Sequence, residues 1–196
     1  YRLSKNKTLP ELVAELVRGP IAIWVTIPEG LRHEEIAQKI ASGLGLAGSE
    51  KQAFLEEFAQ LSQKKEGFLF PDTYLFLKNT THQKVIEKLN STFETRVTDD
   101  ILTSVKNQKL TISELVTLAS IVERETRTDE ERPVVAGILL KRLRAGWALQ
   151  ADATLQYAKS TAQCLPASAS QKALQADIVT SASCNWWGIV TTADKT

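Results

Sequence analysis

Two helical segments, residues 111–126 and 129–146, follow each other almost directly and constrain the fold more than any other part of the sequence. The first segment opens on Thr111 followed by Glu114, which is the T-x-x-E pattern of a capping box. Its apolar side chains recur at the spacing of one helix face and are expected to be buried: Leu115, Leu118, Ala119 and Val122.

The second segment repeats the capping pattern with Thr128 and Glu131. Pro133 is compatible with a helix here because it falls in the first turn. Its larger apolar side chains are expected to face the core: Val134, Val135, Ile138, Leu139 and Leu143. Since so few residues separate the two segments, they predict a helical hairpin or corner.

The rest of the chain predicts a mixture of helices and short strands. Apolar periodicity indicates helices at residues 8–19, 31–45, 50–62, about 81–95 and 98–107, and the β-branched run 21–27 indicates a strand. Residues 64–76 contain Gly67 and Pro71, which rule out a continuous helix, so an extended segment around a Pro-Asp turn is expected. In this segment Asp72 is either a turn residue or a substrate ligand.

Residues 147–158 carry polar side chains at alternating positions. In an extended chain, Gln150, Asp152 and Thr154 would share one face, with Tyr157 following near a helix start. Residues 159–185 contain few large apolar side chains and predict an inserted loop or weak helices.

Charge and hydropathy exclude several classes of function. The formal net charge is +1, from 24 basic and 23 acidic residues, so no positive field favours nucleic acid or anionic lipid. No apolar run is long enough to span a bilayer, and no signal peptide is present. Because the chain starts at Tyr1 and has no Met, we expect it to be a piece of a longer protein, with an anchor or signal outside it.

Few side chains are suited to nucleophilic or metal chemistry. The two histidines, His33 and His82, lie in polar helical surroundings, and no P-loop or dinucleotide fingerprint is present. Cys164 and Cys184 have no CxxC spacing, so they are either a disulfide pair or two separate thiols. We expect no metal and no cofactor, which leaves carboxylate acid/base chemistry for an enzyme.

Glu123 and Glu125 are the carboxylates that most invite a catalytic reading. They lie about 200° apart around a helix and are therefore alternatives rather than a dyad. Both flank the apolar stripe, where desolvation would raise a carboxyl pKa toward that of a general acid. Equally, both could pair with nearby arginines on a surface, and the residues alone leave this choice open.

Four ordered motifs resemble the YceG-like endolytic murein transglycosylases, the MltG type. They are GFLFPDTYLF (67–76), LASIVERET (118–126), ERPVVAGILLKRLRAG (131–146) and LQADATLQYA (149–158). VTIPEG with the following EEIAQKIA is similar to the part of that family that forms a LysM-like subdomain. The chain departs from the family at Ala153, where the family usually has Pro, and it lacks the family's later Y-N-T-Y and G-L-P-P-G-P-I segments.

The resemblance implies an α+β fold with two parts. Residues 1–48 would form a partial LysM-like subdomain. Residues 49–196 would form a mostly helical, lysozyme-like catalytic domain with short β segments, truncated at its C-terminal end and carrying the polar insertion at about 159–185.

The resemblance also implies an activity, which is endolytic cleavage of peptidoglycan between N-acetylmuramic acid and N-acetylglucosamine, leaving a 1,6-anhydro end. It implies Glu125 as the single acid and then base, with Glu123 structural. Substrate-binding positions would be Gln150, Asp152, Thr154, Tyr157, Asp72 and Tyr74, the last two in a more supportive role.

The expected partners are peptidoglycan glycan strands and cell-wall synthesis enzymes, at the extracytoplasmic face of the bacterial cytoplasmic membrane. The alternative function is a peptidoglycan-binding scaffold of cell-wall synthesis that does not cut.

Overall fold

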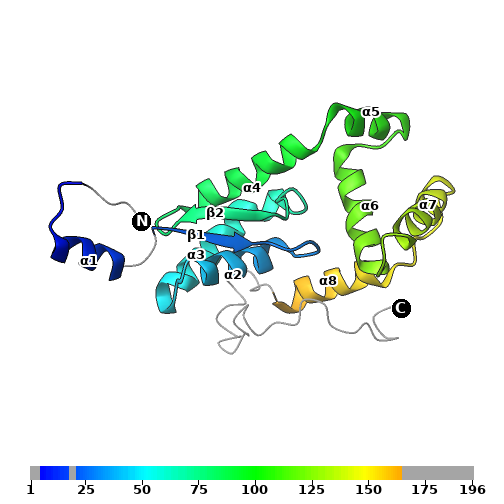
Figure 1. Cartoon of the computed structure of the whole chain (residues 1–196). Helices are drawn as coiled ribbons and strands as arrows, with labels where there is room; N and C mark the ends of the chain where they lie inside the picture. The colour runs from blue at the N-terminus through cyan, green and yellow to red at the C-terminus, as the bar shows by residue number, and fades with distance from the viewer. Residues whose placement is uncertain (1–4, 18–20, 165–196) are drawn as a thin grey trace. The chain divides into compact units, whose positions relative to one another are not determined.

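Two short strands, β1 (Ala22–Thr26) and β2 (Thr73–Leu77), pair antiparallel although two helices separate them in the sequence. The register runs from Ala22 opposite Leu77 to Thr26 opposite Thr73. Figure 1 shows the two strands side by side. The computed structural model describes residues 5–17 and 21–164, with side chains described as far as residue 159. Helices make up most of this part of the chain, so the fold is α+β, as expected.

The connection between the strands consists of α2 (His33–Gly43), α3 (Gly48–Ser62) and the short 3-10 helix η1 (Gln63–Lys65). Helix α2 packs on α3 and on β1, and α3 also packs on α4 (His82–Arg96). These elements confirm the predicted strand at 21–27 and the predicted helices at 31–45, 50–62 and 81–95.

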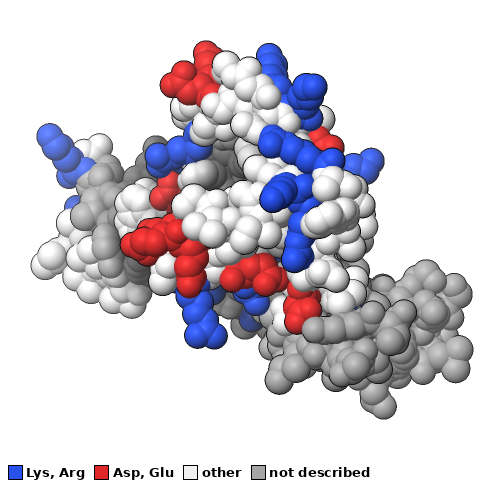
Figure 2. Space-filling model, turned by 90° about the vertical axis from the view of Figure 1, so that its right-hand side faces the viewer, with Lys and Arg blue, Asp and Glu red and all other residues white. Residues whose placement is uncertain are grey.

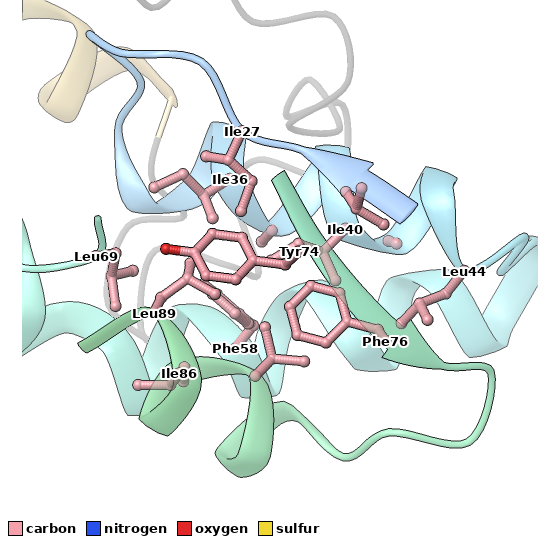
Figure 3. Packing of buried hydrophobic residues seen from close by; sticks show 14 of the residues in the cluster. Ile27, Ile36, Ile40, Leu44, Phe58, Leu69, Tyr74, Phe76, Ile86 and Leu89 are labelled. Atoms are coloured by element: carbon pink, nitrogen blue, oxygen red, sulfur yellow. The ribbon is translucent and has the colours of Figure 1, made fainter. Parts of the chain in front are cut away.

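Alternation along the strands separates a buried face from an exposed one. Val25, Tyr74 and Phe76 are buried, whereas Trp24 and Leu75 on the opposite face are exposed. Figure 3 shows the rings of Tyr74 and Phe76 pointing from β2 into the apolar cluster of the helices. The fully buried members of that cluster include Ile40, Phe58, Val85 and Leu89.

The first helix, α1 (Leu9–Val17), confirms the helix expected at 8–19, but none of its residues is buried. At the other end of this region, α5 (Asp99–Asn107) follows α4 as predicted. None of the described helices combines the length and the apolar character needed to cross a membrane.

The later helices are α6 (Ile112–Glu125), α7 (Glu131–Arg144) and α8 (Asp152–Cys164). Helix α6 packs against α7 and α8 around a small cluster formed by Leu118, Ile121, Val122, Leu139 and Ala151. The predicted capping box is present: Glu114 N donates to Thr111 Oγ1 (3.2 Å) and Thr111 N donates to Glu114 Oε2 (2.7 Å).

Four expectations about this region were wrong. Ala119, expected in the buried stripe of α6, is exposed. The N-cap of α7 is Glu130, with no side-chain cap, rather than Thr128. Helix α7 buries Leu139, but Val134, Ile138 and Leu143 are exposed, because the face turned toward α6 is centred on Leu139 and the half-buried Val135. The alternating segment is not extended either, since α8 begins at Asp152. The helix continues past residue 159, where the sequence allowed an inserted loop or weak helices.

Two compact units divide the chain, residues 1–102 and residues 103–196, so they meet inside α5. The predicted boundary after residue 48 does not coincide with this division, and β1 pairs with β2 and α2 packs on α3 across that position. Cys184 and the side chain of Cys164 lie outside the described residues, as does most of the segment 159–185.

Candidate active site

Glu125 is the last residue of α6, and the chain leaves the helix directly after it. Thr126 has an extended backbone (φ −119°, ψ 151°) and caps the helix, its N–H and its Oγ1 both donating to the carbonyl of Val122. The Glu125 side chain is solvent-exposed, so of the two alternatives that the sequence left open, the surface position is the one observed. The cap explains this, because it ends the helix before a further turn can cover the side chain.

The Glu125 carboxylate contacts the first turn of α8. Its Oε1 accepts a hydrogen bond from the backbone N–H of Ala153 at 3.3 Å. The first N–H groups of a helix have no partner within the helix, and the helix dipole favours negative charge at that end. A proline at position 153 would have no N–H to donate, so this contact depends on the departure from the family pattern.

A groove of about 590 Å³, open to solvent, lies beside Glu125. Its volume falls within the range that small ligands occupy in proteins. Helix α7 supplies one apolar wall, and the charged groups come from the end of α6, the turn that follows it and the start of α7. The lining residues are Glu125, Arg127, Glu130, Glu131, Val134 and Val135.

Two other carboxylates of this region are already engaged. Glu131 Oε2 accepts the backbone N–H groups of Arg127 (2.9 Å) and Thr128 (3.2 Å), and these hydrogen bonds lower the Glu131 pKa. Glu123 pairs with Arg132 at 3.1 Å, on the surface. Glu131 is therefore held as a carboxylate and Glu123 has a structural ion pair, which leaves Glu125 as the better candidate for proton transfer.

The polar positions of the LQADATLQY motif gather around the start of α8. Gln150 precedes the helix with a left-handed backbone (φ 55°), a conformation that non-glycine residues rarely adopt. Asp152 is exposed in the first turn, and Thr154 donates from Oγ1 to the carbonyl of Ala151 at 2.8 Å. Tyr157 is exposed one turn further along. The structure thus brings the start of this motif to Glu125, through a helix start rather than an extended strand.

Asp72 and Tyr74 belong to the first unit and have partners there. Asp72 accepts the N–H of Thr73 (2.7 Å) and lies 3.4 Å from Arg96 Nη2. Tyr74 is 4% exposed, its hydroxyl donates to the carbonyl of Phe70 (2.7 Å), and burial raises its pKa. Asp72 acts as the turn residue that the sequence allowed. For Tyr74, direct contact with a substrate does not fit its burial in the core.

Sequence reasoning missed two parts of this site. The N–H of Ala153 carries no side-chain signal, and only the start of α8 at Asp152 brings it near Glu125. The groove-lining residues Arg127 and Glu130 were not singled out either, although the T-x-x-E pattern identified Glu131 as a capping residue. Figure 2 shows basic and acidic side chains together on the face that it draws, in agreement with the low net charge.

Comparison with known proteins gives a match to a family model and to curated relatives. The model of the YceG-like family matches residues 1–181. A protein of Streptococcus pneumoniae serotype 2, named endolytic murein transglycosylase, is 27% identical over 192 residues, covering 81% of this chain and 35% of the relative. A protein of Bacillus subtilis with the same name is 27% identical over 185 residues, covering 81% of this chain and 50% of the relative.

A solved structure resembles the fold. The crystal structure of a yceG-like protein from Listeria monocytogenes matches with a TM-score of 0.62 at 24% identity, covering 81% of this chain and 60% of that one. At this identity the likeness supports the fold alone. The chain spans between about a third and a half of the length of the curated relatives.

Proposed function

The chain belongs to the YceG-like family, and from this premise we propose that it is part of an endolytic peptidoglycan lytic transglycosylase. Relatives that are 27% identical carry the name endolytic murein transglycosylase, which makes glycan strands of peptidoglycan the proposed substrate. The observation that carries the proposal is the position of Glu125, at the end of α6 beside an open groove.

The proposed reaction uses one carboxyl twice. Protonated Glu125 donates its proton to the glycosidic oxygen, and the bond between that oxygen and C1 of the N-acetylmuramic acid breaks. The carboxylate then takes the proton of that sugar's own 6-hydroxyl, whose oxygen bonds to C1 and closes the 1,6-anhydro ring. One carboxyl can serve as acid and then base in successive steps. Water does not enter the products, so a second carboxylate to activate it is unnecessary.

The contacts of the site support this assignment. Two backbone N–H groups lower the pKa of Glu131 and hold it in its charged form, so it is not suited to donate a proton. Glu123 is engaged in a surface ion pair with Arg132. The Ala153 N–H fixes Oε1 of Glu125, and we assign Oε2 to the substrate. We propose that the sugars are bound by the polar residues at and near the start of α8, which are Gln150, Asp152, Thr154 and Tyr157.

We propose that the first unit supports the reaction without taking part in it. Asp72 and Tyr74 then hold β2 and its turn in place rather than contact glycan. If the unit contains a LysM-like subdomain, β2 and α3 must belong to it, because they are the partners of β1 and α2. The proposed location is the extracytoplasmic face of the bacterial cytoplasmic membrane, with cell-wall synthesis enzymes as partners.

The Glu125 assignment is tested by digesting purified peptidoglycan with the full-length protein and with its Glu125→Gln variant. The amide keeps the shape of the side chain but cannot exchange the proton. We expect formation of anhydro-muropeptides, measured by mass spectrometry, to fall about 100-fold or more, the usual contribution of a general acid.

Glu123→Gln is the matched control, because it lies two residues away on the same helix and keeps its activity if its role is the ion pair with Arg132. Equal anhydro product from the wild type and Glu125→Gln would contradict the assignment. If the wild type binds glycan strands without forming any anhydro product, the non-catalytic scaffold is the better account.

A further inference from the structure

A buried polar cluster in the first unit has no role in the proposed reaction. It joins the start of α2 to the segment after η1 through Arg32, His33, Glu34, Ser62 and Glu66. Arg32, His33, Glu34 and Ser62 are each at most 7% exposed, and the Glu66 side chain is 30% exposed. Burying this many polar groups is costly unless each is paired.

The hydrogen bonds of His33 fix which ring nitrogen faces the carboxylates. Ser62 Oγ donates to the carbonyl of Phe58 (2.6 Å), so it accepts from Nδ1–H of His33 (2.8 Å). Nε2 of the same ring therefore points at Glu34 Oε1, 3.0 Å away, and at Glu66 Oε2, 3.6 Å away. In the neutral ring this nitrogen carries a lone pair, which is the form that binds metals.

Glu34 Oε1 is the atom that the cluster leaves unsatisfied. It is buried, and although it lies close to Nε2 it accepts no hydrogen bond of normal geometry within the described part of the chain. The other oxygen, Oε2, accepts from Arg32 Nε at 3.2 Å. Burial alone would raise the Glu34 pKa, but the neighbouring His33 and Arg32 outweigh it and the pKa is lowered. Glu66 Oε2 already accepts the backbone N–H of His33 at 3.1 Å. When the His33 ring is neutral, its Nε2 lone pair and the two carboxylate oxygens face one another, and a cation between them would bind all three.

From this geometry we infer that His33 Nε2, Glu34 Oε1 and Glu66 Oε2 form a binding site for a zinc ion, with water as the fourth ligand. The three atoms lie within 4.8 Å of one another. In a tetrahedral zinc site with bonds of about 2.0–2.1 Å, neighbouring ligand atoms are about 3.3 Å apart. The two distances from Nε2, 3.0 and 3.6 Å, lie on either side of that value.

The surroundings are those that a zinc-binding histidine requires. Such histidines donate their other N–H to a fixed acceptor, and Ser62 has that role here. A nitrogen ligand and only three protein ligands favour zinc over Mg²⁺ or Ca²⁺, which prefer six or more oxygen ligands. The ion would join two segments that are 33 residues apart in sequence, so it would stabilise the first unit independently of glycan cleavage.

The test is titration of the full-length protein with ZnCl2, measured by calorimetry, together with thermal unfolding in zinc and in EDTA. The background carries Cys164→Ser and Cys184→Ser, because thiolates also bind zinc. We expect one zinc ion per chain and a higher Tm in zinc than in EDTA. MgCl2 should leave the Tm unchanged.

Three variants distinguish zinc binding at this cluster from zinc binding elsewhere on the protein. Glu66→Gln removes one ligand at the most exposed position of the cluster and should abolish the Tm difference. Ser62→Ala should weaken zinc binding by about 10–100-fold while keeping all three ligands. His82→Gln should change nothing, because the other histidine of the chain has a single carboxylate partner, Glu57.

Circular dichroism in EDTA establishes that each variant is folded before its zinc binding is compared. The inference is overturned if the folded background protein binds no zinc, or if Glu66→Gln binds it as tightly as the background does.

Discussion

The Tyr74 side chain is buried on β2, and its hydroxyl donates to the carbonyl of Phe70. We predict that Tyr74→Phe lowers the free energy of unfolding of the first unit by about 1 kcal/mol, because one buried hydrogen bond is lost. Activity per folded molecule should stay unchanged. Urea unfolding and the anhydro-muropeptide assay measure the two effects.

Tyr157→Phe provides the opposite case with the same chemical change. Tyr157 is exposed at α8 and is proposed to bind the sugars, so losing its hydroxyl should reduce glycan cleavage with little change in stability. If Tyr74→Phe reduced cleavage while unfolding at the same urea concentration as the wild type, Tyr74 would contact substrate after all.

At the residue scale, the limits of sequence reasoning lie in the backbone. Helical phase left Glu123 and Glu125 nearly equivalent, and the resemblance favoured Glu125. What distinguishes them in the structure is the Ala153 N–H beside Glu125 and Arg132 beside Glu123. The first partner is a main-chain group 28 residues away and the second lies on the next helix. The local pattern allowed an arginine partner for either glutamate, and Arg132 pairs with Glu123, but it gave no sign of the Ala153 contact.

At the scale of elements, Gly43 shows how closely α2 approaches β1. A Cβ on Gly43 would lie 2.6 Å from Cγ2 of Val25, a stiff and buried side chain. Overpacking of this kind costs about 1–3 kcal/mol of stability. The higher helix propensity of alanine offsets at most about 1 kcal/mol of that cost. We therefore predict that Gly43→Ala destabilises the first unit by about 1 kcal/mol in urea unfolding.

Gly137→Ala is the matched control for this prediction. Gly137 lies inside α7, and a Cβ there would meet nothing within 4 Å among the described residues. The substitution therefore has only the effect of the higher helix propensity of alanine, so the variant should be more stable than the wild type by about 0.5–1 kcal/mol. If both glycines responded with the same sign, close approach of α2 to β1 would not explain the result at Gly43.

Element positions followed from the sequence more reliably than element faces did. Capping and periodicity located α6, including the bonds between Thr111 and Glu114. They did not predict which side of α7 is buried, because α7 carries apolar side chains on several sides. Its packing on α6 alone determines which of these side chains are buried. The start of α8 was missed because alternation of Gln150, Asp152 and Thr154 fits a strand, whereas the left-handed Gln150 ends the extended chain before Asp152.

At the scale of the whole molecule, the domain boundary was the least predictable feature. The resemblance implied a boundary after residue 48, yet the pairing of β1 with β2 joins segments from both sides of it. Strand pairing across two intervening helices leaves no local signal in either strand. The α+β class, in contrast, followed from counting elements and did not require their pairing.

The two units have separate apolar clusters, which share no residue. A chain built in this way departs from two-state behaviour, so we predict two thermal transitions in differential scanning calorimetry. Gly43→Ala should destabilise the first unit only. Thr111→Ala should destabilise the second unit only, since losing the hydroxyl cap of α6 costs about 1 kcal/mol. A change of 1 kcal/mol moves the Tm of a unit of this size by about 4–8 °C.

Each variant should therefore lower one transition and leave the other within error, and the double variant should lower both. Thr111→Ser is the control for the second unit, because its hydroxyl can still accept the N–H of Glu114 and should restore the transition. A single transition lowered by both variants would mean that the units unfold together. The buried clusters would then be coupled in stability although they share no side chain.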